Sequence, residues 1–195
     1  DIFFDLEIIA FGTHLSKKHG FTIHDIEKDG YDTVHKITSI INDDSEKGIV
    51  LSYAKTIIEF SEFWNIHKYD LVFCVGDRFE VNAAVQASIP FGVKLAHLHG
   101  GETTLGAIDN IYRHQITLSS HIHFVASMPF FDRIIEIKGA SDRIYDVGAL
   151  SLDGVKNLAL PDWSDVREIF NIPDKEFILI TFHPQTINSI ENQIY

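Results

Sequence analysis

Short apolar runs separated by longer segments of helical period limit most strongly how this chain can fold. We expect strands in the apolar runs, at residues 6–10, 71–75, 93–97, 121–126, 143–147 and 177–182. Helices are expected between them, at residues 33–41, 48–64, 79–88, 109–119, 130–137 and 163–170. Strands that alternate with helices build βαβ units around a parallel sheet. The pattern therefore predicts an α/β fold with a doubly wound, Rossmann-like parallel sheet.

Two prolines mark a domain boundary. Pro161 and Pro173 bracket a polar helical segment that precedes the last apolar run. We interpret residues 1–158 as one Rossmann-like domain whose first strand is missing, and residues 159–195 as a linker helix and the start of a second such domain, mostly missing. The sequence thus reads as a piece of a two-domain protein, truncated at both ends. Two such domains would enclose a ligand cleft between the carboxyl ends of their sheets.

The charge of the chain argues against two classes of partner. Its 16 Lys and Arg residues are outnumbered by 28 Asp and Glu residues, which leaves a net charge of -12. Nucleic acid and anionic membrane surfaces would be repelled by such a protein. A polyanionic ligand such as a nucleotide diphosphate would need cations and N–H donors gathered in one cleft.

Cysteine usage and hydropathy point to the cytoplasm. Cys74 is the single cysteine, so no intrachain disulfide can form, as is usual in a reducing compartment. The apolar runs are far shorter than the roughly 20 residues that span a bilayer, and no signal peptide is visible.

Polar side chains follow three of the expected strands. Gly76, Asp77 and Arg78 follow the 71–75 run. Ligands of open parallel sheets bind beyond the carboxyl ends of the strands, so a carboxylate and a guanidinium here are candidates for catalysis and substrate binding. The alternative is a glycine turn in which Asp77 caps the next helix and Arg78 is solvated.

The segment His97-Leu-His-Gly-Gly-Glu102 follows the next strand. Gly100 and Gly101 would let the backbone approach a ligand, while His99 and Glu102 flank that approach. A strand places His97 and His99 on one face, which raises a metal site as an alternative. No closing set of ligands follows from the spacing, so we predict no metal there and leave His97 a possible core residue.

The loop after these glycines leads directly into a helix. Thr103 and Thr104 precede it, and Asp109 and Arg113 lie in its first turns. A helix N-terminus attracts a diphosphate with about 0.3–1 kcal/mol per exposed charge, so hydroxyls and Arg113 would have to add to it. The alternative for Asp109 is plain stabilisation of the helix N-terminus.

Three further histidines lie on or directly after expected strands. His183 follows the last apolar run and precedes Pro184, so a bent loop could direct its imidazole toward the interdomain cleft. The alternative is a hydrogen-bonded histidine at a strand end. His121 and His123 alternate on a strand with no glycine loop nearby, and we interpret both as structural or surface residues.

Taken in order, these motifs resemble the hydrolysing UDP-N-acetylglucosamine 2-epimerases. The resemblance extends from about Gly12 to the end of the chain and rests on segments 75–80, 97–102, 106–109, 113–114, 147–150 and 181–184. It implies the two-domain glycosyltransferase-B-like (GT-B) fold, with the substrate in the interdomain cleft and without a cofactor. It also implies that an upstream phosphate loop and most of the uridine-binding domain lie outside this chain.

The resemblance implies roles for single residues. Asp77 and Asp109 match catalytic acidic residues, His183 matches a histidine near the diphosphate, and Arg113 is a plausible phosphate partner. Several relatives carry glutamate where this chain has His99, so either His99 or Glu102 would transfer the proton. The predicted catalytic residues are Asp77, His99, Glu102, Asp109 and His183. The predicted substrate-binding residues are Gly76, Arg78, Gly100, Gly101, Thr103, Thr104 and Arg113.

The family reaction converts UDP-N-acetylglucosamine and water into N-acetylmannosamine and UDP, for sialic-acid-type sugars. The same chemistry on a UDP-linked diacetamido-trideoxy hexose is the nearest alternative. A UDP-sugar glycosyltransferase, a non-catalytic sugar-nucleotide sensor and a metal hydrolase are the others. The resemblance implies a homodimer or tetramer, and we expect the isolated piece to be inactive.

Overall fold

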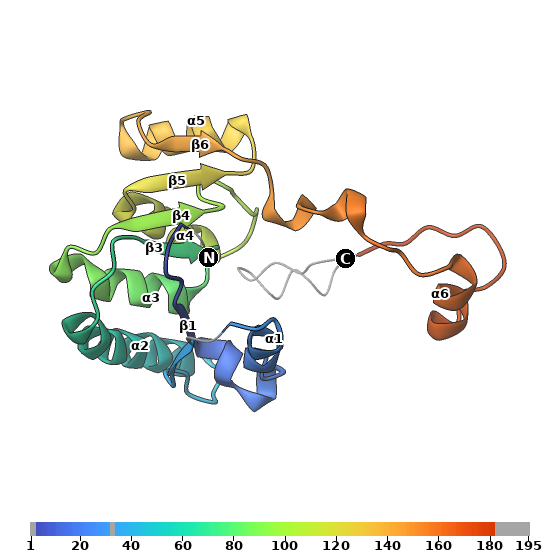
Figure 1. Ribbon diagram of the computed structural model, residues 1–195, viewed down its shortest axis with the longest axis horizontal. Helices are drawn as coiled ribbons and strands as arrows, with labels where there is room; N and C mark the ends of the chain where they lie inside the picture. The colour runs from blue at the N-terminus through green and yellow to red at the C-terminus, as the bar shows by residue number, and fades with distance from the viewer. Residues whose placement is uncertain (1–2, 32–33, 182–195) are drawn as a thin grey trace.

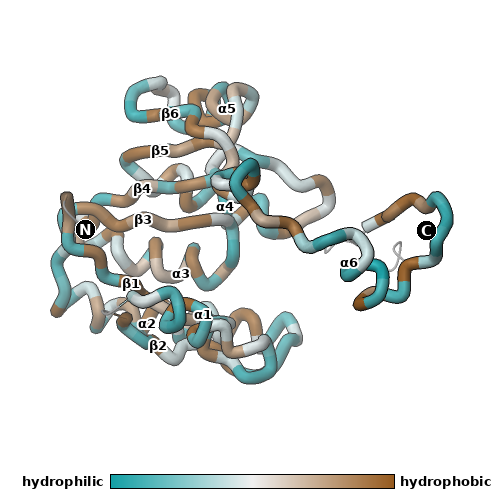
Figure 2. The backbone as a smooth tube through the Cα atoms, turned by 45° about the vertical axis from the view of Figure 1, so that its right-hand side comes forward, coloured by the Kyte–Doolittle hydropathy of each residue, from teal (hydrophilic) through white to brown (hydrophobic). Residues whose placement is uncertain are grey.

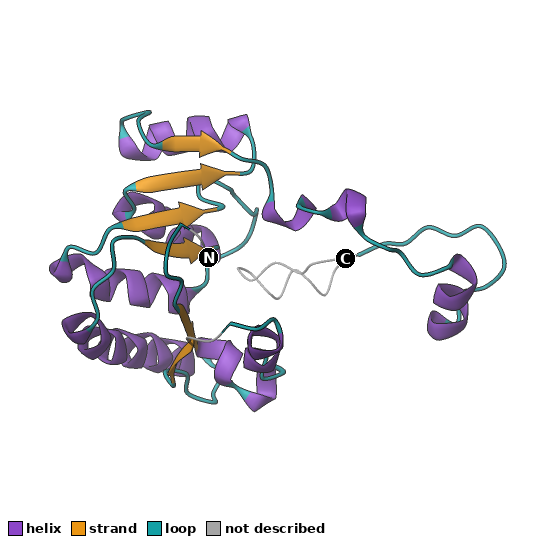
Figure 3. Ribbon diagram, in the orientation of Figure 1, coloured by secondary structure: helices purple, strands orange, loops and turns teal. Residues whose placement is uncertain are grey.

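A computed structural model describes residues 3–31 and 34–181 and confirms the predicted α/β class (Figures 1 and 3). All strand pairs are parallel. The larger sheet has the order β3-β4-β5-β6, with β3 at Val72–Val75, β4 at Leu95–Leu98, β5 at Ile122–Val125 and β6 at Ile144–Asp146. A separate two-stranded sheet pairs β1 (Ile8–Phe11) with β2 (Val34–Ile37).

The helices connect these strands. They are α1 (Ile23–Lys28), α2 (Glu46–Ile66), α3 (Phe79–Ser88), α4 (Asp109–Ser119), α5 (Met128–Lys138) and α6 (Trp163–Phe170). Single 3-10 turns lie at η1 (Gly12–Leu15), η2 (Lys17–His19), η3 (Ile89–Phe91), η4 (Leu150–Leu152) and η5 (Val155–Asn157). The long α2 begins where the Ser45 hydroxyl accepts a hydrogen bond from the Gly48 N–H, a standard N-cap. No helix in the described part of the chain is long and apolar enough to cross a membrane.

Consecutive strand order places the connecting helices on one face of the larger sheet. Strand-helix-strand crossovers are right-handed in nearly all proteins, so α3, α4 and α5 follow one another along the same face. The helix α2 packs outside α3 (Figure 1). The carboxyl ends of β3 to β6 therefore share one edge of the sheet, and loops that begin there can contribute to one site.

The core consists of three apolar clusters. Between α2 and α3, the buried residues Phe60, Phe63 and Trp64 pack on Ala84 and Ala87. The other two clusters lie between the larger sheet and its helices. One comprises Cys74, Val85, Leu95 and Ile116, and the other comprises Val125, Ile134 and Ile144. Burying each large side chain stabilises the fold by about 1.5–3 kcal/mol.

The opposite face of the larger sheet carries exposed aromatic side chains. Ring centroids of Phe73 and Phe124 lie 6.0 Å apart, and those of Phe124 and Tyr145 lie 5.6 Å apart. Phe73 and Tyr145 are more than half exposed. Figure 2 shows that β3 has the colour of hydrophobic residues along its length. Such double-sided apolar character is typical of parallel strands.

Two predicted elements are corrected by the structure. Within the helix expected at 33–41, residues 34–37 form the strand β2, which pairs with β1 from Val34↔Ile8 to Ile37↔Phe11, and residues 38–41 have no regular structure; Thr33 lies outside the described residues. Backbone pairing with a distant segment decides this stretch, and its β-branched residues suit a strand. Residues 177–181, expected as most of a strand, have no regular structure and are exposed. A strand needs a ladder partner, and none pairs with them within residues 3–31 and 34–181.

Candidate active site

The turns after β3 and β4 lie side by side at the carboxyl edge of the larger sheet. The two strands pair in register from Val72↔Leu95 to Val75↔Leu98. The Gly76 N–H continues this pairing by donating to the Leu98 carbonyl at 3.2 Å. Gly76 has a φ of +83°, a left-handed conformation that glycine adopts without strain. Asp77 and His99 consequently begin neighbouring loops.

Arg113, on α4, contacts both of these loops. Its side chain is 6% exposed and forms an ion pair with Asp77. The same guanidinium donates to the Glu102 carbonyl at 2.8 Å and to Asn110 Oδ1 at 3.2 Å. Arg113 was predicted to bind substrate phosphate, but its guanidinium is covered and bonded to protein groups. Arg113, on α4, therefore ties the Asp77 carboxylate and the Glu102 backbone to this helix.

His99 and Glu102 form a second polar pair beside Asp77. Nδ1 of His99 lies 2.8 Å from Oε1 of Glu102, and the two side chains are 23% and 27% exposed. The backbone of His99 has a φ of +63°, a left-handed conformation that costs a non-glycine residue about 1–3 kcal/mol. The His99 N–H donates to the Phe124 carbonyl at 3.0 Å, which holds this conformation. Backbone strain of this kind is concentrated at functional sites.

Gly100 and Gly101 are buried, and both are required by packing. A Cβ on Gly100 would lie 2.9 Å from Nδ1 of His97 and 3.0 Å from Oγ1 of Thr117. A Cβ on Gly101 would lie 2.5 Å from the Phe130 carbonyl oxygen, and its φ is +78°. The structure thus explains both glycines by close approach to the protein core. Their predicted contact with substrate stays a prediction.

His97 is a core residue, which is the interpretation that the sequence offers as the alternative to a metal site. It is fully buried, and burial lowers the pKa of its imidazole to about 4, so the ring is neutral near pH 7. Nε2 must donate to the Gly76 carbonyl at 2.8 Å, which leaves Nδ1 to accept from the Thr117 hydroxyl at 3.1 Å. Both ring nitrogens are used, so the His97 and His99 pair does not offer a metal site.

Arg78 is the exposed cation of the site. Its guanidinium is 57% exposed and binds the buried Glu80 carboxylate through two hydrogen bonds of 2.9 and 3.1 Å. These bonds raise the pKa of Arg78, and the negative charges of Asp109 and Asp77 raise it further. Arg78 therefore lies within electrostatic reach of both predicted catalytic aspartates.

The turn after β1 also reaches this site, which the three polar strand-end motifs do not predict. Gly12 has a φ of +60°, and a Cβ on it would lie 3.0 Å from Cγ of Glu80. The 3-10 turn η1 therefore packs directly on the carboxylate that holds Arg78. The signal was present in the sequence, because Gly12 follows an apolar run just as Gly76 does.

Asn110 fastens the loop between β4 and α4. Its Oδ1 accepts from the Thr104 N–H at 2.9 Å, and its Nδ2 donates to the carbonyls of Thr104 and Ala107 at 2.6 and 3.0 Å. Thr103 and Thr104 are exposed above the N-terminus of α4, where Asp109 is the first helical residue. The loop is thus held open at the helix end, where a phosphate could approach.

The structure brings together most, but not all, of the predicted site. Asp77, Arg78, His99, Glu102 and Arg113 share one sheet edge, whereas His183 lies outside the described residues. A concavity of about 880 Å³ lies elsewhere, between α6 and residues 173–178. None of the described site residues lines this concavity. His121 and His123 line another hollow, of about 350 Å³, away from this site.

Comparison with known proteins agrees with the motifs. The family model described as UDP-N-acetylglucosamine 2-epimerase matches residues 1–194. A Campylobacter jejuni GDP/UDP-N,N'-diacetylbacillosamine 2-epimerase (hydrolyzing) is 34% identical over 94% of this chain and 48% of its own length. A Legionella pneumophila UDP-N,N'-diacetylbacillosamine 2-epimerase (hydrolyzing) is 31% identical over 97% of this chain and 51% of its own length. The chain spans about half the length of these curated relatives.

A solved structure supports the fold. The crystal structure of UDP-GlcNAc 2-epimerase from Neisseria meningitidis bound to UDP-GlcNAc matches with a TM-score of 0.61 at 14% identity. The match covers 86% of this chain and 47% of that protein, so the chain has the fold of part of a GT-B-like protein. Because the family model matches nearly every residue and two relatives exceed 30% identity, the chain belongs to the UDP-N-acetylglucosamine 2-epimerase family.

Proposed function

We propose that this chain supplies the proton-transfer groups of a hydrolysing UDP-sugar 2-epimerase. The network that joins Asp77, Arg113 and Glu102 carries the proposal, because Arg113 binds the Asp77 carboxylate and the Glu102 backbone and so ties together the turns after two neighbouring strands. Family membership supplies the reaction class. The relatives are about twice as long as this chain, so the complete reaction also needs groups beyond it.

The chemistry of the sugar explains why several acidic groups are needed. The hydrogen at C2 is not adjacent to a ketone, so it is not acidic enough for direct abstraction and return. Loss of that proton together with loss of UDP from C1 gives an unsaturated sugar. Water then adds its hydroxyl to C1, and C2 receives a proton on the opposite face. The net reaction consumes one water and releases UDP and the epimerised sugar.

The geometry suggests a division of labour. Asp77 and the pair of His99 and Glu102 are each about one quarter exposed, so they can exchange protons with a bound sugar. Asp109 is a further acidic candidate at the same edge. Arg113 positions the two loops that carry Asp77 and Glu102. His183, which the resemblance places near the diphosphate, completes the predicted catalytic set.

Diphosphate binding is assigned to the exposed donors. Arg78 offers a guanidinium at the rim of the site, and Thr103 and Thr104 offer hydroxyls above the N-terminus of α4. Cations and helix N-termini stabilise the negative charge that develops on a departing diphosphate. Gly76, Gly100 and Gly101 shape the turns that carry these donors.

For the substrate, we propose a UDP-linked diacetamido-trideoxy hexose of the diacetylbacillosamine type. The 34% and 31% identical relatives carry names with this sugar, which favours it over UDP-N-acetylglucosamine. UDP-N-acetylglucosamine, with release of N-acetylmannosamine for sialic-acid-type sugars, is the second candidate. It is supported by the name of the matching family model.

The test uses the full-length protein and measures UDP release and the freed sugar from both UDP-sugars in D₂O. We expect one deuterium at C2 of the product, no requirement for an acceptor, and faster turnover of the diacetamido sugar. Asp77→Asn should abolish UDP release while ligand binding persists. Transfer only to an added acceptor would identify a glycosyltransferase, and binding without any UDP release would identify a sensor. Preference for UDP-N-acetylglucosamine would overturn the substrate assignment alone.

Compartment and assembly are also proposals. We propose a cytoplasmic location, because a chain whose single cysteine is Cys74 forms no intrachain disulfide, as is usual in a reducing compartment. Burial raises the pKa of the Cys74 thiol to about 12. We expect a homodimer or tetramer, which light scattering of the protein would establish.

A further inference from the structure

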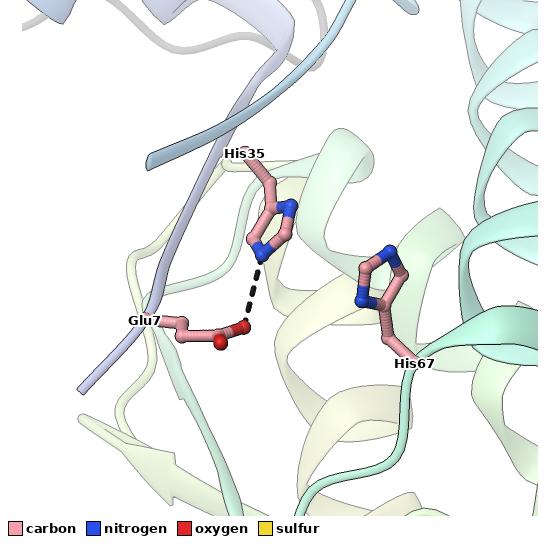
Figure 4. A group of neighbouring side chains, drawn as sticks. All are labelled: Glu7, His35 and His67. Atoms are coloured by element: carbon pink, nitrogen blue, oxygen red, sulfur yellow. Dashed lines mark hydrogen bonds and ion pairs between the residues drawn. The ribbon is translucent and has the colours of Figure 1, made fainter. Parts of the chain in front are cut away.

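Three potential metal ligands meet at the far end of β1 from the candidate active site. Glu7 lies just before β1, His35 lies on β2, and His67 ends α2 (Figure 4). Their ligand atoms all lie within 4.8 Å of one another. Figure 4 shows the three side chains turned toward a common point between them. Within residues 3–31 and 34–181, no other such set of three was found.

Backbone pairing brings the three residues together from distant parts of the chain. The parallel register pairs Ile8 with Val34 and Ile9 with His35, so Glu7 reaches the His35 side chain. Nε2 of His35 lies 2.9 Å from Oε2 of Glu7. The last turn of α2 then delivers His67, whose N–H donates to the Phe63 carbonyl at 2.9 Å.

Aromatic rings hold the two imidazoles in place. His67 stacks on Phe63 at 4.3 Å, and Phe63 also stacks on Tyr69 at 6.2 Å. The His35 and His67 rings meet edge to face at 4.7 Å. Phe63 belongs to the buried core, so the frame behind the histidines is rigid. Preorganisation of this kind lowers the entropic cost of binding an ion.

Tyr69 supports the carboxylate from behind. Its hydroxyl donates to Oε2 of Glu7 at 2.6 Å. Carboxylates and imidazoles that bind metals are usually oriented by such outer hydrogen bonds, whose loss weakens binding about 10–100-fold. Tyr69 therefore supplies Glu7, His35 and His67 with the outer hydrogen bond that is typical of metal sites and that a chance surface cluster of acidic residues lacks.

We propose that Glu7, His35 and His67 form a binding site for a divalent transition-metal ion such as Zn²⁺. Because the three ligand atoms lie within 4.8 Å of one another, a central point exists that is at most about 2.8 Å from each of them. Zinc bonds measure about 2.0–2.2 Å. Side-chain shifts of less than about 1 Å complete the three-ligand shell. Glu7 and His35 are 38% and 25% exposed, which leaves access for a water in the fourth position. Two imidazoles and one carboxylate suit zinc or iron(II) better than magnesium or calcium.

The position of this site defines its role. Strand β1 separates Glu7 at one end from Gly12 at the other, and Gly12 packs on Glu80 of the candidate active site. An ion at the Glu7 end would fasten β1 and β2 to the end of α2. The proposed ion thus stabilises the two-stranded sheet and takes no part in the sugar chemistry. This inference does not rest on the proposed epimerase activity.

The experiment titrates the metal-free full chain with Zn²⁺ by calorimetry and with Co²⁺ by visible absorption. We expect one saturable equivalent, intense Co²⁺ bands of a low-coordinate site, and a higher Tm with Zn²⁺. His67→Gln should weaken binding on the order of 100-fold, and Tyr69→Phe on the order of 10-fold. The control is His24→Gln, because His24 is 72% exposed and forms a similar His–Glu contact with Glu27.

The outcomes separate clearly. Binding that His67→Gln leaves unchanged, or that His24→Gln weakens equally, would overturn the site, as would the absence of binding. If His67→Gln does not fold, Glu7→Gln replaces it, since its amide can keep the contact with Tyr69 while losing the anionic ligand. Circular dichroism of each metal-free variant separates lost binding from lost folding.

Discussion

Arg113 on α4 forms a buried ion pair with Asp77 in the turn after β3, and this pair ties the predicted catalytic carboxylate to the protein core. The guanidinium is 6% exposed, whereas the carboxylate is 26% exposed. Arg113 is therefore part of the protein interior, whereas Asp77 is accessible from the solvent side where a substrate would arrive. Arg113, which the motifs predict to bind phosphate, thus forms an ion pair with the residue that they predict to transfer protons.

Arg113→Ala should destabilise the protein by about 3 kcal/mol, at the lower end for breaking a buried pair because Asp77 is partly solvated. Urea unfolding measures this change. Arg133→Ala is the matched control, since Arg133 is half exposed and pairs with the exposed Glu136. Its effect should stay within about 0.5 kcal/mol. Equal effects of the two substitutions would contradict the organising role of Arg113.

Glu102→Gln should lower UDP release by about 10²–10⁴-fold if the pair with His99 transfers a proton. Folding should persist, because the Glu102 group that Arg113 binds is the backbone carbonyl. The rate is measured by coupled UDP detection at saturating UDP-sugar. An unchanged rate would assign the proton transfer to Asp77 or Asp109 instead.

His99 offers a test of backbone strain. Its φ of +63° favours glycine, so His99→Gly should be more stable than His99→Ala by about 1 kcal/mol. Both variants remove the imidazole and should lower activity alike. Thermal unfolding of the two variants provides the comparison. Equal stability would show that the left-handed conformation relaxes once the side chain is gone.

Gly101→Ala should destabilise the protein by more than about 2 kcal/mol, because the added Cβ would overlap the Phe130 carbonyl in a left-handed backbone. Gly139→Ala is the control, with a φ of +72° and no atom within 4 Å of the new Cβ. It should cost only the conformational term of about 1 kcal/mol. The difference in urea midpoints isolates the steric contribution.

Buried histidines should make the protein sensitive to mild acid. Burial lowers the pKa values of both His97 and His123 to about 4, below their unfolded value near 6.5. The unfolded chain then binds protons first as pH falls, so stability is complete above about pH 6.5 and is lost between there and pH 4. The loss is on the order of 3 kcal/mol for each histidine.

His123→Leu isolates one of these two contributions. Both ring nitrogens of His123 are buried without a hydrogen-bond partner, so an apolar side chain should raise stability at pH 7 by about 1–3 kcal/mol. It should also flatten the fall in stability between pH 6.5 and 4. Chemical unfolding at several pH values measures both effects. An unchanged pH slope would mean that His123 titrates normally in the folded state.

Local pattern was enough to predict the elements that carry the site. The apolar runs 71–75 and 93–97 became β3 and β4, and Gly76 and the 100–101 glycines marked the turns after them. Strand ends and positive-φ glycines are local properties, so periodicity and residue type reveal them. The same local rules failed at residues 33–41, where pairing with β1 overrode the helical pattern.

The α/β class, the family and the order of the motifs can be read from the sequence, because they depend on short-range periodicity and residue identity. Folding in three dimensions is needed to bring Arg113 to Asp77, to make His97 a neutral core residue, and to bring Glu7, His35 and His67 together. Each of these facts joins segments far apart along the chain. Such contacts depend on strand register and helix packing, which residue spacing in one sequence does not specify.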